Sequence, residues 1–140
     1  MERYTLKNDI RVFGKKVTSF PDGISEAFDE LVKTVGGFDR SYYGISFMEG
    51  NKMIYYAVAE EREKEEAKKY DCESMVIEKG DYLTVKIEDW RENICLIKDA
   101  FGELVNDKRT NKAKPAIEWY KNDKEMLCMV KTTEQKKVTA

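Results

Sequence analysis

The chain has 140 residues, of which 41% are hydrophobic and 37% charged, and these proportions predict a single soluble globular domain. Its formal net charge is −2 and no stripe of Lys and Arg mixes with aromatic residues, which argues against nucleic-acid binding, and no apolar run is long enough to span a membrane. The sequence has no histidine, which removes the commonest general base and metal ligand and every Ser-His or Cys-His nucleophile pair.

The first half of the chain predicts a strand, a helix and a hairpin. Residues 9–18 are rich in β-branched and aromatic residues and predict a strand, which "FPDG" then turns. A one-sided helix is expected to begin at Ile24 and to end at the Gly36–Gly37 pair. "YYGISFM" and "KMIYYAVAE" predict two strands joined by a tight turn at Gly50–Asn51. The apolar stripe of the helix is Ile24, Phe28, Leu31, Val32 and Val35.

The second half begins with a charged connector and then repeats the same kinds of element. Residues 60–70 are nearly all charged and predict a solvated connector or short surface helix without a chemical role. "ESMVIEKG" and "DYLTVKIED" predict a strand pair around Lys79–Gly80, and a second one-sided helix follows. "AIEWY" and "MLCMV" predict a last hairpin that turns at Asn122–Asp123. The stripe of the second helix is Trp90, Ile94, Ile97, Phe101, Leu104 and Val105.

The two halves resemble each other at a constant offset. "AFDELV" at 27–32 recurs as "AFGELV" at 100–105, and the same offset places Ile24 on Ile97. Each half therefore predicts strand, helix, strand, turn, strand, which indicates an internal duplication. Two such units can form one antiparallel sheet with both helices on one face, and we expect a cleft on the other face along the seam between the repeats.

These segments together resemble the GyrI-like effector-binding domains, the ligand-sensing modules of multidrug-responsive transcription activators, which also occur as single-domain proteins. The resemblance runs from about residue 9 to residue 131, through "FPDGISEAFDELV", "YYGISF", "MIYYAVAEE", "IEKGDYLTV" and above all "AIEWY" followed by "MLCMV". It implies an α+β fold of two pseudo-symmetric β-α-β-β repeats around a ligand cleft, over residues 1–131, with a flexible tail over 132–140.

Glu118 is the strongest candidate for a functional residue, because it interrupts an apolar strand between Ile117 and Trp119. Strict alternation could place Glu118 and Tyr120 outward on a solvated face while Ile117 and Trp119 fill the core. The alternative places Glu118 on the cleft face, where a buried carboxylate requires a protein cation, a proton or a ligand cation to neutralise it. The family's characteristic "E-x-Y" glutamate matches Glu118, which by the resemblance would bind cationic drugs.

Aromatic and methionine side chains could form the remainder of such a pocket, since aromatic faces attract cations and methionine adapts to varied shapes. For each aromatic residue, ordinary core packing is the competing interpretation. The family commonly has a glycine before the second helix, where this chain has Trp90, which could cap or narrow the cleft. The candidate ligand-binding residues are Glu118, Tyr43, Phe47, Tyr55, Trp119 and Tyr120, followed by Trp90 and Tyr82.

The leading functional hypothesis is a cytoplasmic binding module for an amphipathic, cationic small molecule. The N-terminal "MERYTLKNDIRVFG" has no apolar signal region, and no helix-turn-helix segment precedes residue 9, so transcriptional output would require a DNA-binding partner protein. A second hypothesis is a hydrolase that uses Glu118 as general acid or base, with Tyr43 or Tyr120 assisting. A third, inhibition of a partner such as a topoisomerase, follows from the family name alone.

The three cysteines are too scattered for a zinc site or a disulfide framework. We expect Cys72, Cys95 and Cys128 to be reduced packing residues. Neither a metal nor a cofactor is expected.

Overall fold

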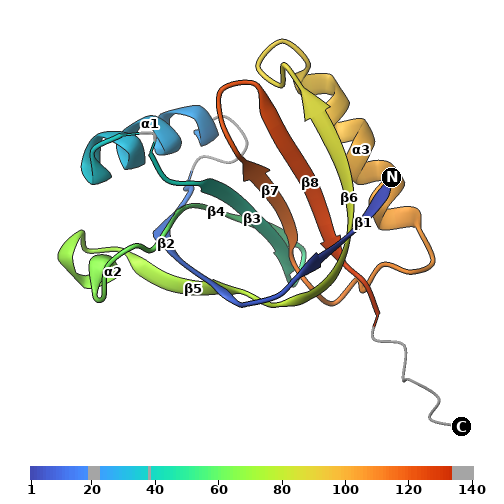
Figure 1. Cartoon of the computed structure of the whole chain (residues 1–140), viewed down its shortest axis with the longest axis horizontal. Coiled ribbons are helices and arrows are strands. Elements are labelled where there is room, and N and C mark those ends of the chain that lie inside the picture. The colour runs from blue at the N-terminus through green and yellow to red at the C-terminus, as the bar shows by residue number, and fades with distance from the viewer. Residues whose placement is uncertain (19–22, 38, 134–140) are drawn as a thin grey trace, which may run out of the picture.

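A computed structural model describes residues 1–18, 23–37 and 39–133 of the chain, and it consists of one curled antiparallel sheet with helices on one face (Figure 1). The sheet order is β1-β6-β8-β7-β3-β4-β2-β5. The strands are β1 (Glu2–Leu6), β2 (Ile10–Lys16), β3 (Tyr42–Glu49), β4 (Lys52–Glu60), β5 (Glu73–Ile77), β6 (Gly80–Glu88), β7 (Ala116–Tyr120) and β8 (Glu125–Lys131), and the helices are α1 (Ile24–Val35), α2 (Glu66–Lys69) and α3 (Ile94–Asn106).

The duplicated architecture predicted from the sequence is confirmed. The seam between the two repeats is the β3–β7 pair at the centre of the sheet, with α1 over the first repeat and α3 over the second (Figure 1). α1 ends as expected, because Gly36 adopts φ 87° and its N–H donates to the carbonyl of Val32. The β3–β4 hairpin turns at Gly50, where φ is 61° and Glu49 pairs with Lys52. The "FPDG" turn falls mostly outside the described residues.

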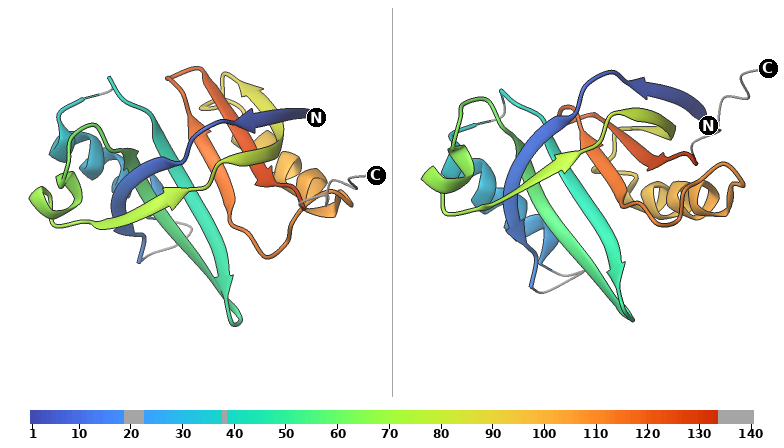
Figure 2. Two further views of the ribbon diagram at one scale, coloured as in Figure 1. Left: turned by 60° about the horizontal axis from the view of Figure 1, so that its bottom comes forward. Right: turned by 90° about the horizontal axis from the view of Figure 1, so that it is seen from below.

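The predicted hairpin around Lys79–Gly80 is wrong. β5 pairs with β2, and β6 pairs with β1 and β8, so the two consecutive strands lie in different halves of the sheet. β1 was not predicted at all, because "ERYTL" is short, charged and mostly exposed. Each repeat therefore contributes its first strand to the edge of the other repeat, and Figure 2 shows β1 and β5 crossing over the body of the sheet.

Both faces of the sheet are buried, which explains why several strands lack an alternating pattern. The curled sheet encloses an inner-face core to which all eight strands contribute, including Val12, Tyr43, Val58 and Met129. The opposite face packs against α1 through Leu31 and against α3 through residues that include Ala100 and Leu104. Within the described residues, each helix is too short or too polar to cross a lipid bilayer.

The second helix and the charged connector differ from expectation at two points. α3 begins at Ile94, and Trp90 lies before it, beyond Asp89, which adopts φ 49°. In the connector, α2 is a short helix as predicted, but its Glu66 is buried and ion-paired with Arg40 at 2.9 Å. The connector is therefore anchored to the body of the domain by a buried carboxylate.

Two further expectations are modified near the end of the chain and at the cysteines. Thr132, placed in the expected tail, is buried, and its N–H donates to the carbonyl of Asp81 at 3.0 Å. The tail from residue 134 lies outside the described residues. Cys128 is buried as a packing residue, whereas Cys95 is exposed and does not have that role.

Candidate functional site

Glu118 lies in the middle of β7, paired with Gly44 of β3 on one side and with Cys128 of β8 on the other. Alternation along β7 directs Ile117 and Trp119 into the inner-face core, and Glu118 and Tyr120 to the face that carries α1 and α3. The prediction that Glu118 faces a cleft on the side of the sheet opposite the helices is therefore wrong. Its carboxylate lies on the helix face, at the seam between the repeats.

Two tyrosine hydroxyls donate to the same oxygen of Glu118. The hydroxyl of Tyr55, on β4, makes a short hydrogen bond to Oε1, and the hydroxyl of Tyr120 donates to Oε1 at 3.1 Å. Oε2 accepts no hydrogen bond from the described residues, and it is not completely buried. No Lys or Arg of the described chain lies within 4.0 Å of this carboxylate.

Gly44 provides the space in which Glu118 and Tyr55 meet. A Cβ atom at position 44 would lie 2.0 Å from the hydroxyl oxygen of Tyr55 and 2.3 Å from Oε1 of Glu118. Both distances are far below van der Waals contact, so any larger residue would force the pair apart. The glycine in "YYGISF" is therefore required by the close approach of two side chains.

The electrostatics of the site favour the neutral form of every titratable group in it. Burial raises the pKa of Glu118 above its ordinary value, and the two tyrosine hydrogen bonds only partly oppose this rise. Burial also raises the pKa of Tyr55 and of Tyr120, and the neighbouring Glu118 charge adds to both. The pKa of the Cys128 thiol is raised to about 12 by burial and then by Glu118. The site thus disfavours a negative charge that has no positive partner.

Aromatic rings from both repeats contact the two tyrosines that bind Glu118. Phe28 of α1 contacts Tyr55 and Tyr120 edge-on, with ring centroids 6.4 Å and 5.3 Å apart. The ring centroids of Trp90 and Tyr120 lie 4.9 Å apart, and the indole N–H of Trp90 donates to the carbonyl of Asn122. We name the five residues Phe28, Tyr55, Trp90, Glu118 and Tyr120 the Glu118 cluster.

Comparison with known proteins identifies the fold. No family model matches the sequence, and no curated protein matches it. Among solved structures, SAV2435 bound to tetraphenylphosphonium superposes with a TM-score of 0.70 at 13% identity, covering 95% of this chain and 94% of that one. The integron cassette protein VCH_CASS2 from the mobile metagenome of Vibrio cholerae gives a TM-score of 0.67 at 13% identity, covering 94% and 95%. A hydrolase from Listeria innocua gives 0.56 at 11% identity, covering 94% and 91%.

The chain has the GyrI-like fold. This is the fold that the sequence resemblance implied, and the likeness extends over nearly the whole length of each structure compared. The two repeats of the GyrI-like fold meet at β3 and β7, where Glu118 and Gly44 face each other.

Within the GyrI-like fold, the predicted site residues divide between two faces of the sheet. Tyr55, Tyr120 and Trp90 lie beside Glu118 on the helix face. The other four belong to the inner-face core, where the rings of Tyr43 and Trp119 stack at 6.0 Å. Because neighbouring residues of a strand point to opposite faces, Trp119 cannot reach a ligand held by Glu118. Those four residues are Tyr43, Phe47, Tyr82 and Trp119.

Sequence reasoning missed Phe28 and Gly44 as parts of the site. Phe28 was assigned to the core stripe of α1, but its ring also contacts both tyrosines that bind Glu118. The duplication does not identify Phe28 as a site residue, because the sequence does not show that α1 packs near Tyr120 of β7. Gly44 gave a usable signal: a glycine inside a strand often marks a close approach of neighbouring groups.

Proposed function

We propose that this domain binds lipophilic aromatic cations at the Glu118 cluster and acts as a small-molecule effector-binding domain. The observation that carries the proposal is a partly buried carboxylate whose described partners are only tyrosine hydroxyls. A carboxylate in that position is stabilised by a cation, and the described chain supplies none within ion-pair distance. A ligand cation would supply the missing charge.

The rings of the cluster favour cations with aromatic bodies. A cation placed over an aromatic face gains about 0.5 to 2 kcal/mol. Phe28 and Trp90 each contact Tyr120, and neither described hollow of the structure includes Glu118. Ligand entry would therefore have to separate these rings. SAV2435, which has the same fold, was solved with tetraphenylphosphonium, a lipophilic aromatic cation, and this supports the choice of ligand class.

The proposed role is drug sensing or drug sequestration. Binding several such cations would make it a multidrug-binding domain, because charge selects the class while the ring-lined wall tolerates different shapes. Any transcription regulation would require a DNA-binding module that reads the ligand-bound domain.

Calorimetry with a matched pair of ligands tests this proposal. Tetraphenylphosphonium is expected to bind with a stoichiometry of about one, and neutral triphenylphosphine oxide at least about tenfold more weakly, which corresponds to about 1.4 kcal/mol. Both compounds present phenyl rings around phosphorus, but the oxide has no net charge and carries an oxygen in place of the fourth ring. Equal affinity for the two compounds would show that the site selects apolar surface without regard to charge, and the proposal would be withdrawn.

A second candidate function is hydrolysis of an electrophilic ring. It is favoured by the raised pKa of Glu118 between two hydroxyl groups, a combination suited to a general acid or base, and by the fold shared with the Listeria innocua hydrolase. Incubation with an epoxide distinguishes the two functions. If the domain only binds ligands, we expect the epoxide to be recovered unchanged. Turnover of the epoxide that is lost in Glu118→Ala would establish that the domain is a hydrolase.

A further inference from the structure

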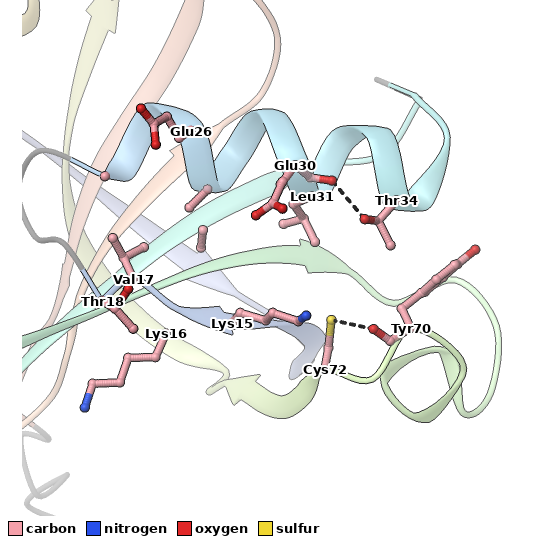
Figure 3. Close-up of a pocket in the computed structure, with 13 residues that line it drawn as sticks. Lys15, Lys16, Val17, Thr18, Glu26, Glu30, Leu31, Thr34, Tyr70 and Cys72 are labelled. Atoms are coloured by element: carbon pink, nitrogen blue, oxygen red, sulfur yellow. Dashed lines mark hydrogen bonds between the residues drawn. The ribbon is translucent and has the colours of Figure 1, made fainter.

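A concave site lies beside α1 and contains no residue of the Glu118 cluster. A hollow of about 250 Å³ lies between α1 and the end of β2. Figure 3 shows Tyr70 and Cys72 at one end of it. Such a volume lies below the roughly 300 to 1,000 Å³ of drug-sized ligand pockets. A ligand of this hollow must therefore be compact.

The two walls of this hollow carry opposite charges. Lys15 comes from β2, and Glu30 comes from α1. The carboxylate of Glu30 projects from the helix towards the sheet, and the Lys15 side chain extends along the opposite wall towards Cys72 (Figure 3). Neither group has an ion-pair partner within 4.0 Å among the described residues. Lys16 and Glu26 also line the hollow, but their charged ends point away from it (Figure 3).

The rest of the lining offers few polar groups to a ligand. Val17, Leu31 and Ala57 are buried apolar residues of the hollow. The hydroxyl of Thr34 donates to the carbonyl of Glu30 at 2.9 Å, and the thiol of Cys72 donates to the carbonyl of Tyr70 at 3.5 Å. Recognition by side chains in this hollow therefore depends mainly on its opposed charges.

We propose that this hollow binds a compact zwitterion of the amino-acid type. The ligand carboxylate would pair with Lys15 and its ammonium group with Glu30, and a short aliphatic body would lie on Val17, Leu31 and Ala57. The two charges of such a ligand have opposite signs, as do the two walls. A ligand with a single charge would pair with either Lys15 or Glu30 and leave the other group without an ion-pair partner.

An NMR titration of the labelled full chain tests the inference with glycine, β-alanine and 4-aminobutyrate, which differ only in the spacing of their charges. At least one of them is expected to cause saturable shifts of the Ala27, Thr34 and Cys72 amide signals. Propionate and propylamine, which each lack one charge, should bind more weakly by up to about fivefold, as expected for loss of one exposed ion pair.

Variants of the two walls provide the matched controls. Lys15→Gln and Glu30→Gln should each weaken zwitterion binding about fivefold. Lys52→Gln and Glu49→Gln, which remove a cross-strand pair of exposed charges at the β3–β4 turn, should leave it unchanged, as should Glu118→Gln. Absence of saturable shifts, equal binding of propylamine, or wild-type affinity in both wall variants would overturn the inference.

Discussion

Glu118→Gln is expected to weaken tetraphenylphosphonium binding by about 30-fold or more. Glutamine keeps the shape of the side chain and an oxygen that can accept from Tyr55, but it carries no charge. Loss of the charge partner of a desolvated cation typically costs about 2 kcal/mol or more, which sets the expected factor. Calorimetry on the purified variant measures it directly.

The matched control is Glu88→Gln, which neutralises an exposed glutamate on β6 and changes the net charge by the same amount. It should bind like the wild type. If both variants lose affinity equally, the effect belongs to overall charge, and if neither loses affinity, Glu118 has no part in binding.

The same substitution has a predictable sign for stability. Because the pKa of Glu118 is raised in the folded protein, the folded chain holds this proton to higher pH than the unfolded chain does. Stability from this group is therefore present below the ordinary glutamate pKa and falls as pH rises through the folded pKa. Glutamine does not ionise, so Glu118→Gln does not lose stability in this way as pH rises. At neutral pH the variant should be at least as stable as the wild type, although it binds tetraphenylphosphonium poorly.

Arg40→Met is expected to lower the free energy of unfolding by about 3–5 kcal/mol, because it leaves a buried carboxylate without its cation. Glu66 is 3% exposed and accepts hydrogen bonds from Arg40 and from the backbone N–H groups of Arg62 and Glu63. Although burial opposes them, these bonds hold the pKa of Glu66 below its ordinary value. The pair therefore contributes stability above the ordinary glutamate pKa that is lost as pH falls through the lowered one.

Arg62→Met is the control, since it breaks an exposed pair with Asp39 and leaves Glu66 bonded. Its cost should stay below about 1 kcal/mol. Urea unfolding followed by tryptophan fluorescence measures both variants. Equal costs for the two would show that burial of the Arg40–Glu66 pair has no energetic consequence.

Local patterns were sufficient to predict the helices, the two true hairpins and the duplication. α1 and the β3–β4 turn follow from an apolar stripe and from glycines that adopt positive φ. The exchange of β1 and β5 between repeats could not be predicted in this way. Those pairings join residues far apart in the sequence, and Gly80 next to two strand-like segments is typical of a hairpin.

The site could be predicted only in part, for a related reason. The residue type and position of Glu118 marked it as unusual in an apolar strand. Its face could not be assigned, because a strand buried on both sides has no alternation to distinguish them. Tyr43 and Trp119 were therefore grouped with Tyr55 and Tyr120, although the sheet separates them.

We propose that a ligand cation neutralises the desolvated Glu118 carboxylate, and a carboxyl-carbon NMR titration of Glu118 would detect this neutralisation. Without ligand, Glu118 should titrate above its ordinary pKa because of burial. With saturating tetraphenylphosphonium its pKa should fall, and the affinity should correspondingly increase as pH rises through the ligand-free pKa. A Glu118 pKa that is the same with and without bound tetraphenylphosphonium would show that the bound cation does not neutralise Glu118.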